Sequence, residues 1–311
     1  MATILITGGT GMIGTAVTGE LVQKGHQVII LSRSKNQGSN QKNISYAFWN
    51  PSAGAIDENA IKKADAIIHL AGANVAGGRW TESRKKEIVD SRVKSGALLL
   101  KALTQIPNHI KVVVSASAIG WYGGDEKRNS AIPFVETDPA DYSFLGQTSQ
   151  QWEAAITPVK ELDKRLVIFR FGIVLSIEGG AYAEFAKPLR FKLASILGSG
   201  KQIVSWIHID DVVQMVLFAL NNEKIEGVYN AVAPHPVSNK QLILSMAKAK
   251  GGPYISASVP SFVLKTMLGE MSVEVLKSAT VSAQKIINAG YQFMFPHIDT
   301  ATYNLNKKAS R

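Results

Sequence analysis

Residues 3–34 read TILITGGTGMIGTAVTGELVQKGHQVIILSRS, and this stretch decides the class of fold that we predict. The short run at 3–7 is apolar and β-branched and ends in glycines, which is typical of a buried strand. From Gly11 onward apolar residues recur at every fourth position until Gly25, which indicates a helix and its end. Residues 26–32 again have the composition of a strand. The stretch therefore has the order and the size of a βαβ unit.

The turn between the first strand and the helix carries Gly8, Gly11 and Gly14, with the spacing G-x-x-G-x-x-G. This spacing is a variant of the dinucleotide-binding fingerprint. In such a turn the first glycine allows the tight bend, the second lets a pyrophosphate approach the backbone, and the third lets the helix pack on the sheet. The free N–H groups at the start of the helix then attract phosphates. Because the triplet follows a strand and opens a helix, we predict a dinucleotide site; the alternative is a turn whose glycines serve packing alone.

The end of the second predicted strand distinguishes between two cofactors. NAD sites usually place Asp or Glu there, to hold the ribose 2′-hydroxyl. This chain has Ser32 and Arg33 instead. A carboxylate would repel a 2′-phosphate, whereas a guanidinium binds it through two hydrogen bonds. We therefore predict NADP(H) rather than NAD(H); the alternative is that Arg33 is an ordinary surface residue of a polar loop.

Several continuous apolar runs follow along the chain. Such runs are typical of strands that helices cover on both faces, because neither face then needs polar side chains. The sequence therefore predicts an α/β fold with a Rossmann-like, doubly wound parallel sheet. The predicted strands are 65–72, 111–117, 165–175 and 227–232, and the predicted helices are 82–105 with Thr81 as N-cap, 146–157 and 210–220.

The alternation of apolar strands and helices becomes less regular after about residue 176, which indicates a second, smaller unit. We predict an NADP-binding domain over 1–233, to whose substrate side 176–205 contribute, and a mostly helical C-terminal domain on the substrate side over 234–300. The polar end, 304–311, is expected to fray. In the C-terminal region the predicted helices are 238–249, 260–268 and 272–289, with a strand near 254–257.

Length and composition exclude several classes of protein. The chain has 311 residues, of which 46% are hydrophobic and 19% charged, so it can form a sizeable core and is not disordered. The absence of cysteine excludes disulfide scaffolds and a cysteine nucleophile, and the spacing of the six histidines predicts no metal site. No run suits a membrane span and the start lacks the pattern of a signal peptide, so we expect a cytoplasmic protein.

The formal net charge is +10, and the basic residues are scattered rather than gathered in a block. Scattered charges are typical of a solvated surface. We therefore expect neither nucleic acid nor a membrane as a partner. A small molecule that bears a phosphate needs only one or two of these charges.

Further motifs extend over nearly the whole chain. They include HLAGANV (69–75), RWTESRKKEIVDSR (79–92), SASAIGWYG (115–123), GSGKQIVSWIHIDD (198–211) and PSFVLKTMLGE (260–270). With these motifs the chain resembles the short-chain dehydrogenase/reductase superfamily, in its extended or atypical branch. More narrowly, it is similar to the epimerase family proteins related to NAD-dependent epimerases and dehydratases, which have their own C-terminal helical domain.

The resemblance implies cofactor contacts that the bare sequence does not assign. It adds the segment after the strand at 65–72, two positions of the long helix, and Val174 on the nicotinamide side. Glu87 and Arg92 are alternatively solvated helix charges, and Val174 is alternatively a core residue. The expected cofactor contacts are Gly8, Thr10, Gly11, Met12, Ile13, Ser32, Arg33, Leu70, Ala71, Gly72, Glu87, Arg92 and Val174.

The same resemblance identifies a departure in the catalytic residues. The superfamily uses a Ser or Thr with a Tyr-x-x-x-Lys pair, in which Tyr exchanges a proton while a hydride moves to or from nicotinamide. Ser117 matches the serine, which makes it our candidate catalytic residue. Counting back from Glu153 places Leu145 and Ser149 where the pair should be. Leucine cannot transfer a proton, and serine supplies no fixed positive charge.

Other proton donors are Tyr122, Tyr142 and His208, although each also suits a structural role. The expected walls of the substrate site are 73–80, 118–145, 176–205 and 233–296, and their aromatic residues Trp80, Trp121, Tyr122 and Trp206 serve either the pocket or packing.

Two functions follow from the sequence. One is an NADP(H)-dependent oxidoreductase or epimerase-like enzyme for an unidentified small molecule. The other is an NADP(H)-binding redox sensor or scaffold with little or no turnover.

Overall fold

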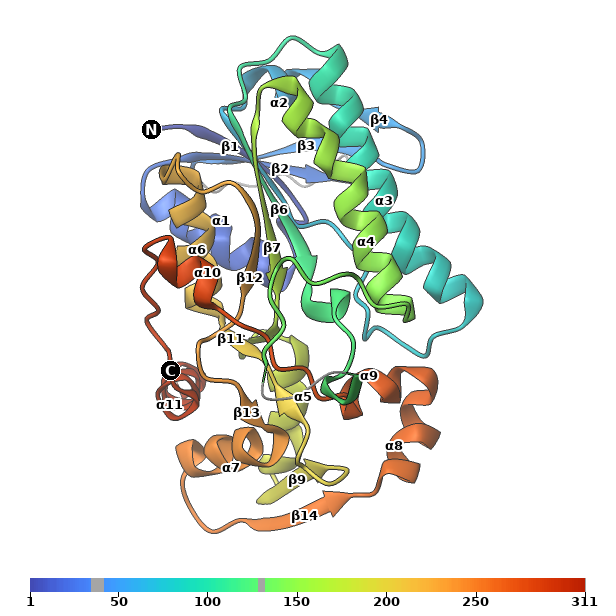
Figure 1. The fold of residues 1–311 in the computed structure, drawn as a ribbon. Helices are drawn as coiled ribbons and strands as arrows, with labels where there is room; N and C mark the ends of the chain where they lie inside the picture. The colour runs from blue at the N-terminus through green and yellow to red at the C-terminus, as the bar shows by residue number, and fades with distance from the viewer. Residues whose placement is uncertain (35–41, 128–131, 311) are drawn as a thin grey trace.

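The computed structural model describes residues 1–34, 42–127 and 132–310, and its centre is an eight-stranded sheet (Figure 1). The strands lie in the order β12-β7-β6-β5-β1-β2-β3-β4, and every neighbouring pair is parallel except β3 and β4. The predicted parallel sheet is thereby confirmed. Its strands are β1 (Thr3–Thr7), β2 (Gln27–Ser32), β3 (Ile44–Asn50), β4 (Ala55–Ile56), β5 (Ala66–His69), β6 (Val112–Ala118), β7 (Arg165–Phe171) and β12 (Gly227–Ala231).

Helices cover both faces of the sheet, which confirms the doubly wound arrangement. Successive side chains of a strand point to opposite faces. Ile4 and Ile6 of β1 therefore join a core with α1 and α6, while Leu5 joins a second core with α2 and α3. This two-sided burial explains why the strands are continuously apolar. The helices on the sheet are α1 (Met12–Gln23), α2 (Glu58–Lys63), α3 (Glu82–Gln105), α4 (Phe144–Ile156) and α6 (Ile209–Asn221).

The order of the strands indicates where a ligand would bind along the carboxyl edge of the sheet. The chain runs from β1 through β2 to β3 on one side, and then returns to add β5, β6, β7 and β12 on the other side of β1. In open α/β sheets, ligands bind outside the carboxyl ends of the strands at such a switch point. The turn that follows β1 lies there.

A second unit continues from the carboxyl end of the sheet and occupies the lower part of Figure 1. It has its own apolar core, to which Leu189, Ile196, Leu242 and Leu305 contribute. Its two-stranded ladders pair β8 with β11, β9 with β14, and β10 with β13. The elements are β8 (Ile173–Leu175), α5 (Gly180–Leu189), β9 (Leu193–Leu197), β10 (Ile203–Val204), β11 (Trp206–His208), β13 (Val237–Ser238), α7 (Asn239–Lys250), β14 (Ile255–Val259), α8 (Ser261–Leu268), α9 (Ser272–Leu276) and α11 (Ile298–Ala309). The short helix α10 (Gln284–Asn288) packs on β12 instead, and its Ile286 belongs to the first core.

Three predicted segments differ from the structure. The strand at 165–175 is two strands, because the chain leaves the sheet at Gly172, whose backbone lies too close to the Ser205 carbonyl for a side chain. The helix at 272–289 is wrong, since α9 and α10 are separated by residues 277–283, which form no helix. The expected fraying at 304–311 is not seen up to Ala309, because α11 continues to that residue and buries Leu305 in the core of the second unit.

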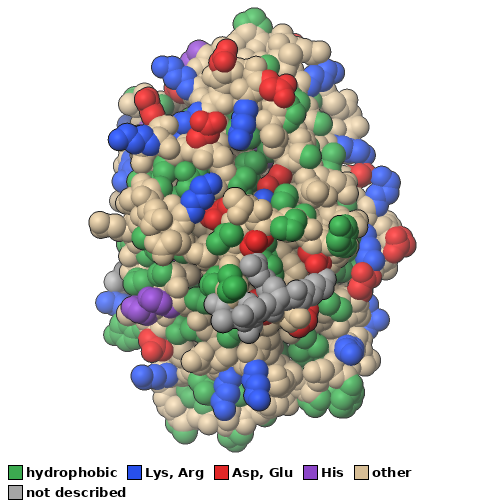
Figure 2. Space-filling view, viewed as in Figure 1, with side chains coloured by type: hydrophobic (Ala, Val, Ile, Leu, Met, Phe, Trp, Pro, Cys, Tyr) green, Lys and Arg blue, Asp and Glu red, His purple; other side chains and the backbone are tan. Residues whose placement is uncertain are grey.

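The surface seen in Figure 2 carries Lys, Arg, Asp and Glu side chains over the whole face, with small groups of hydrophobic side chains between them. Basic and acidic groups alternate over short distances on this face, as the scattered charges in the sequence indicate. Within the described ranges, no helix is both long enough and apolar enough to cross a membrane.

Candidate cofactor and substrate site

The turn after β1 is built by glycines that no other residue replaces without movement. Gly8 has a φ of +69°, and a Cβ added there would lie 2.8 Å from the carbonyl oxygen of Leu70. A Cβ at Gly14 would overlap the Gly8 carbonyl. The turn is closed by the N–H of Gly11, which donates to the Gly8 carbonyl at 3.0 Å. The β1 turn, the start of α1 and the segment after β5 therefore lie in direct contact.

The start of α1 is open to an anion. Gly11 is the N-cap residue, and no side chain caps the helix or places a negative charge in its first turn. The N–H groups of Met12 and Ile13 therefore have no partner within the helix. Gly11 has a φ of −79°, so the backbone does not require glycine at this position. Thr10 and Gly11 are exposed, so a ligand can approach the helix start directly.

A buried polar chain supports the turn from below. Thr7 Oγ1 accepts the N–H groups of Leu70 and Ala71, each at 3.1 Å, and lies 2.7 Å from His69 Nδ1. The other ring nitrogen of His69 lies 3.4 Å from the hydroxyl of Ser95 on α3. Complete burial lowers the pKa of His69 to about 4, so the ring is neutral at pH 7. The neutral ring links α3 to the turn and fixes the segment at 70–71.

Arg92 reaches the same place from α3 as a buried cation. Its side chain is 8% exposed, and its Nη1 donates to the carbonyls of Ala73 at 3.1 Å and Ile88 at 2.9 Å. A Cβ added at Gly72 would lie 3.1 Å from the Arg92 Cζ, and the guanidinium also lies over the Trp152 ring at 4.8 Å. Burial lowers the pKa of Arg92 to about 10. Among the described residues no carboxylate forms an ion pair with this guanidinium, which favours an anionic ligand.

The other predicted contacts lie around this centre. Ser32 ends β2 next to β1, and Arg33 follows it on the surface. Glu87 is exposed, and its carboxylate accepts a hydrogen bond from Arg84 at 2.6 Å. The polar loop predicted after β2 covers 34–43, of which residues 35–41 lie outside the described residues.

Val174 is brought to the start of α1, although the two are far apart in the sequence. A Cβ added at Gly180 would lie 3.6 Å from both the Met12 Sδ and the Val174 carbonyl oxygen. Val174 is half-buried in β8, and its side chain packs against both the first core and the core of the second unit. The predicted nicotinamide side and the predicted phosphate turn are therefore neighbours.

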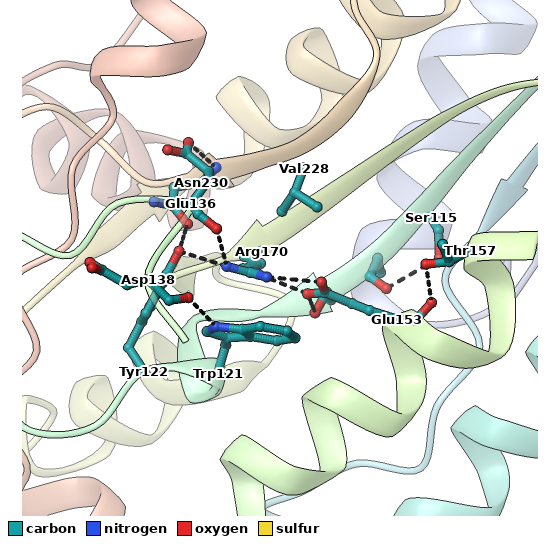
Figure 3. A network of polar contacts seen from close by, with 12 residues as sticks. Ser115, Trp121, Tyr122, Glu136, Asp138, Glu153, Thr157, Arg170, Val228 and Asn230 are labelled. Carbon is teal, nitrogen blue, oxygen red and sulfur yellow. Dashed lines mark hydrogen bonds and ion pairs between the residues drawn. The ribbon is translucent and has the colours of Figure 1, made fainter. Parts of the chain in front are cut away.

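A network of buried polar side chains lies at the carboxyl ends of β6, β7 and β12 (Figure 3). At its centre Arg170 donates to both carboxylate oxygens of Glu153 on α4, at 2.8 and 2.9 Å. Arg170 also donates to the Tyr122 hydroxyl at 3.0 Å and stacks on the Trp121 ring at 3.6 Å from its centroid. The Tyr122 hydroxyl in turn donates to Asn230 Oδ1 at 2.7 Å. The network therefore fixes α4 and the turn after β6 relative to the sheet.

Ser117, the predicted catalytic residue, belongs to this network. It lies near the end of β6, is 2% exposed, and donates its hydroxyl proton to Glu153 at 2.6 Å. Leu145 and Ser149 lie on α4 and face the turn after β6, because a Cβ at Gly120 would lie 3.1 Å from the Leu145 Cβ and 3.8 Å from the Ser149 hydroxyl. The face of α4 that carries Leu145 and Ser149 therefore lies beside the turn after β6.

The positions of the other candidate proton donors, Tyr122, His208 and Tyr142, do not favour proton transfer to a bound substrate. Tyr122 is fully buried, and burial raises its pKa to about 12. His208 is also fully buried, its pKa is lowered to about 4 by burial, and its Nδ1 caps α6 by accepting the Asp210 N–H at 3.0 Å. Tyr142 is 91% exposed. Of the predicted aromatic wall, Tyr122 and Trp206 are core residues, while Trp121 remains half-buried in the turn.

The C-terminal segment is tied to the turn after β6. Asp125 accepts hydrogen bonds from the Ser278 hydroxyl and from the N–H and hydroxyl of Thr280, each at 2.8 Å. Lys277 Nζ donates to the Tyr122 carbonyl at 3.2 Å. Residues after α9 therefore lie across the carboxyl edge of the sheet, on the side that the sequence assigns to the substrate.

Sequence reasoning missed the partners in these networks. Arg170 and Asn230 each interrupt an otherwise apolar strand, and a polar residue in a buried strand must find a partner. That signal was present, but the identity of the partners, Glu153 and Tyr122, depends on the packing of α4 and the turn after β6. No three His, Cys, Asp or Glu side chains of the described residues gather in a way that suits a metal ion.

Comparison with known proteins agrees with this architecture. A family described as the NAD dependent epimerase/dehydratase family matches residues 4–151 and 181–231, and a domain of unknown function, DUF1731, matches residues 259–305. The epimerase family protein YfhF of Bacillus subtilis (strain 168) is 35% identical over 303 residues, which is 97% of each chain. An epimerase family protein of Staphylococcus aureus (strain MRSA252) is 36% identical over 308 residues, 99% of this chain and 100% of that one.

Solved structures give the same result. The crystal structure of the human epimerase family protein SDR39U1 with NADPH has a TM-score of 0.86 and 30% identity, and the match covers 98% of this chain and 99% of that chain. A UDP-N-acetylglucosamine 4-epimerase from Bacillus cereus has a TM-score of 0.77 at 18% identity, covering 100% and 97% of the two chains, which shows a shared fold alone. The resemblance inferred from the sequence is confirmed, and the chain belongs to the NAD-dependent epimerase/dehydratase family.

Proposed function

We propose that this protein binds NADP(H) along the carboxyl edge of the sheet and acts as an epimerase-like or oxidoreductase-like protein on an unidentified small molecule. The observation that carries the proposal is the convergence of an uncapped helix start with a buried, unpaired arginine. Both features favour an anion, and both lie where the fold places its ligands. The human relative was solved with NADPH, which supports this choice of ligand.

The described residues fit such a cofactor. We assign the pyrophosphate to the N–H groups of Met12 and Ile13, with Gly8, Thr10 and Gly11 shaping the space above them. We assign the adenine-side and pyrophosphate contacts to the segment at 70–72, Glu87 and Arg92, and the nicotinamide side to Val174. When bound, the nicotinamide supplies a hydride donor or acceptor. The chain's own contribution is to bind and orient the cofactor.

The choice of NADP(H) over NAD(H) rests on Arg33, and Arg33→Ala tests it. The guanidinium is expected to form charge-assisted hydrogen bonds to the 2′-phosphate, which typically contribute about 1.5–3 kcal/mol. Removing the side chain should weaken NADPH binding by about 10- to 150-fold and leave NADH binding nearly unchanged. Titration calorimetry with both cofactors measures the two affinities on the same variant. An equal loss for the two cofactors would remove Arg33 from the 2′-phosphate site.

Two observations favour the second function, a cofactor-binding sensor or scaffold with little turnover. The first is that the resemblance aligns Leu145 and Ser149 with the positions of the superfamily's Tyr–Lys pair. The second is that two of the three alternative proton donors, Tyr122 and His208, are buried and already form hydrogen bonds within the protein. General acid–base assistance contributes about 10²- to 10⁴-fold to a rate, so turnover of common superfamily substrates should be slow.

An activity panel, run on the wild type and on Ser117→Ala, distinguishes between the two functions. We propose that Ser117 orients a substrate oxygen. For this, its hydroxyl must give up the hydrogen bond to Glu153 and donate to the substrate oxygen instead. The variant should then lower any activity found in a panel of carbonyl compounds and sugar nucleotides, measured by nicotinamide absorbance, without changing NADPH affinity. Activity that is fast and indifferent to Ser117→Ala would contradict this role. Tight NADPH binding without turnover across the panel would favour the sensor or scaffold.

A further inference from the structure

The segment Ser261–Leu276, which contains α8 and α9, is weakly packed on the rest of the molecule. Its only buried residues are Leu264 and Ser272. Three of its apolar side chains face solvent, since Phe262 is 71%, Met267 64% and Val273 60% exposed. A segment that buries so little apolar surface gains little stability from packing. Its position therefore depends on the polar contacts that it makes.

Both ends of this segment are fixed. It follows β14, which pairs with β9 over the full length of the strand. It is followed by Ser278, whose hydroxyl donates to Asp125 and accepts the N–H of Ile203 at 2.9 Å. Within the segment, Gly269 ends α8 with a φ of +61° and joins it to the turn before α9. The segment is thus a flap between two anchors, with a glycine at the bend.

Two cations from the other side of the site hold the flap. Arg79, in the loop after β5, donates through Nε to the Met267 carbonyl at 3.3 Å and through Nη2 to the Thr266 carbonyl, so it caps the end of α8. Lys85, in the first turns of α3, forms an ion pair with Glu270 at 2.6 Å. These contacts join the flap to the same loop and helix that carry Gly72, Glu87 and Arg92. The flap therefore spans from the loop after β5 to the turn after β6.

We propose that Ser261–Leu276 is a gate over the carboxyl edge of the sheet, latched by the contacts of Arg79 and Lys85, and that its opening admits and releases the cofactor. The gating part rests on the proposed function, because it takes NADPH as the ligand that passes. The ion pair is partly exposed, with Lys85 20% and Glu270 49% exposed, so it is weak enough to open repeatedly. A latch of this kind weakens with rising salt.

Charge reversal tests the latch without touching the core. Lys85→Glu and Glu270→Lys each replace attraction by repulsion, and Lys85→Glu/Glu270→Lys restores the pair with reversed polarity. We expect amide exchange in peptides from 261–276 of the free protein to be about three- to tenfold faster in each single variant and close to wild type in the double variant. The matched control is Lys86→Glu, which changes the charge equally but breaks only the pair of Lys86 with Asp90 on α3.

The gate is tested by the dissociation rate of NADPH, measured by stopped-flow displacement on the same variants. We expect each single variant to release NADPH faster by a similar factor, and the double variant and Lys86→Glu to release it at the wild-type rate. Single variants that exchange no faster than Lys86→Glu would overturn the latch. Faster exchange with an unchanged release rate would overturn the gate. If the wild type failed to bind NADPH, the proposed function would fail, while the exchange comparison would still decide whether the latch exists.

Discussion

Gly11→Val should abolish measurable NADPH binding while the protein remains folded. The φ of −79° suits valine, and an added Cβ would lie 3.3 Å from the Gly8 carbonyl oxygen, so the turn needs only a small adjustment. The new side chain would nevertheless occupy the space that a pyrophosphate needs above the N–H groups of Met12 and Ile13. Two charge-assisted hydrogen bonds of about 1.5–3 kcal/mol each correspond to a loss of roughly 10²- to 10⁴-fold in affinity. Calorimetric titration with NADPH and thermal melting measure the two effects.

Gly19→Val is the matched control for this variant. Gly19 lies on the exposed face of the same helix, and an added Cβ there meets nothing within 4 Å. It should bind NADPH as the wild type does. Gly14→Val, by contrast, should lose stability as well as binding, because its Cβ overlaps the Gly8 carbonyl. Normal NADPH binding by Gly11→Val would show that the turn is not the phosphate site.

Arg170→Met should destabilise the fold strongly. The substitution leaves the Glu153 carboxylate buried without its cation, and removing one partner of a buried ion pair costs about 3–5 kcal/mol. It also removes the donor to the Tyr122 hydroxyl and the group stacked on Trp121. Urea denaturation followed by fluorescence and circular dichroism measures the free energy of unfolding. We expect a lower midpoint with little change in the slope.

Two controls separate the buried pair from a general effect of charge. Arg170→Met/Glu153→Gln removes both charges and should recover part of the lost stability, because no unpaired charge remains buried. Lys187→Met breaks the exposed pair with Glu184 and should cost less than about 1 kcal/mol. A loss below about 1 kcal/mol in Arg170→Met would contradict the role given to the network.

The sequence predicts the central sheet well because its strands are buried on both faces. Continuous apolar runs fall on β1, β2, β5, β6, β7 and β12, and the helix at 82–105 is found with its N-cap residue, because Thr81 accepts the N–H of Arg84 at 3.2 Å. The edge of the sheet was missed. The strand β3 reads ISYAFWN and is mostly half-buried, so it has neither a continuous apolar run nor a clean alternation.

The second unit is less predictable because its elements are short and depend on distant partners. Residues 277–283 form no helix, and Val281 pairs instead with Phe134 and donates its N–H to the Ser205 hydroxyl at 2.9 Å. Neither partner is near in the sequence. The last turns of α11 are polar in composition, but Leu305 faces the core of the second unit and holds them in place.

The candidate site divides in the same way. The glycine turn and Arg33 can be found from the sequence because the backbone and a single charge determine their chemistry. The burial of Ser117 against Glu153 cannot, because it requires the packing of α4 on β6. The flap contacts of Arg79 and Lys85 likewise join segments separated by most of the chain.

The most direct test of the central claim is a titration of the wild-type protein with NADPH and with NADH under identical conditions. We expect NADPH to bind at one site per chain, at least about tenfold more tightly than NADH, because Arg33 is exposed at the end of β2 and no acidic residue stands at that position. Equal or tighter binding of NADH would contradict the assignment of Arg33. No binding of either cofactor would contradict the account of the β1 turn as a dinucleotide site.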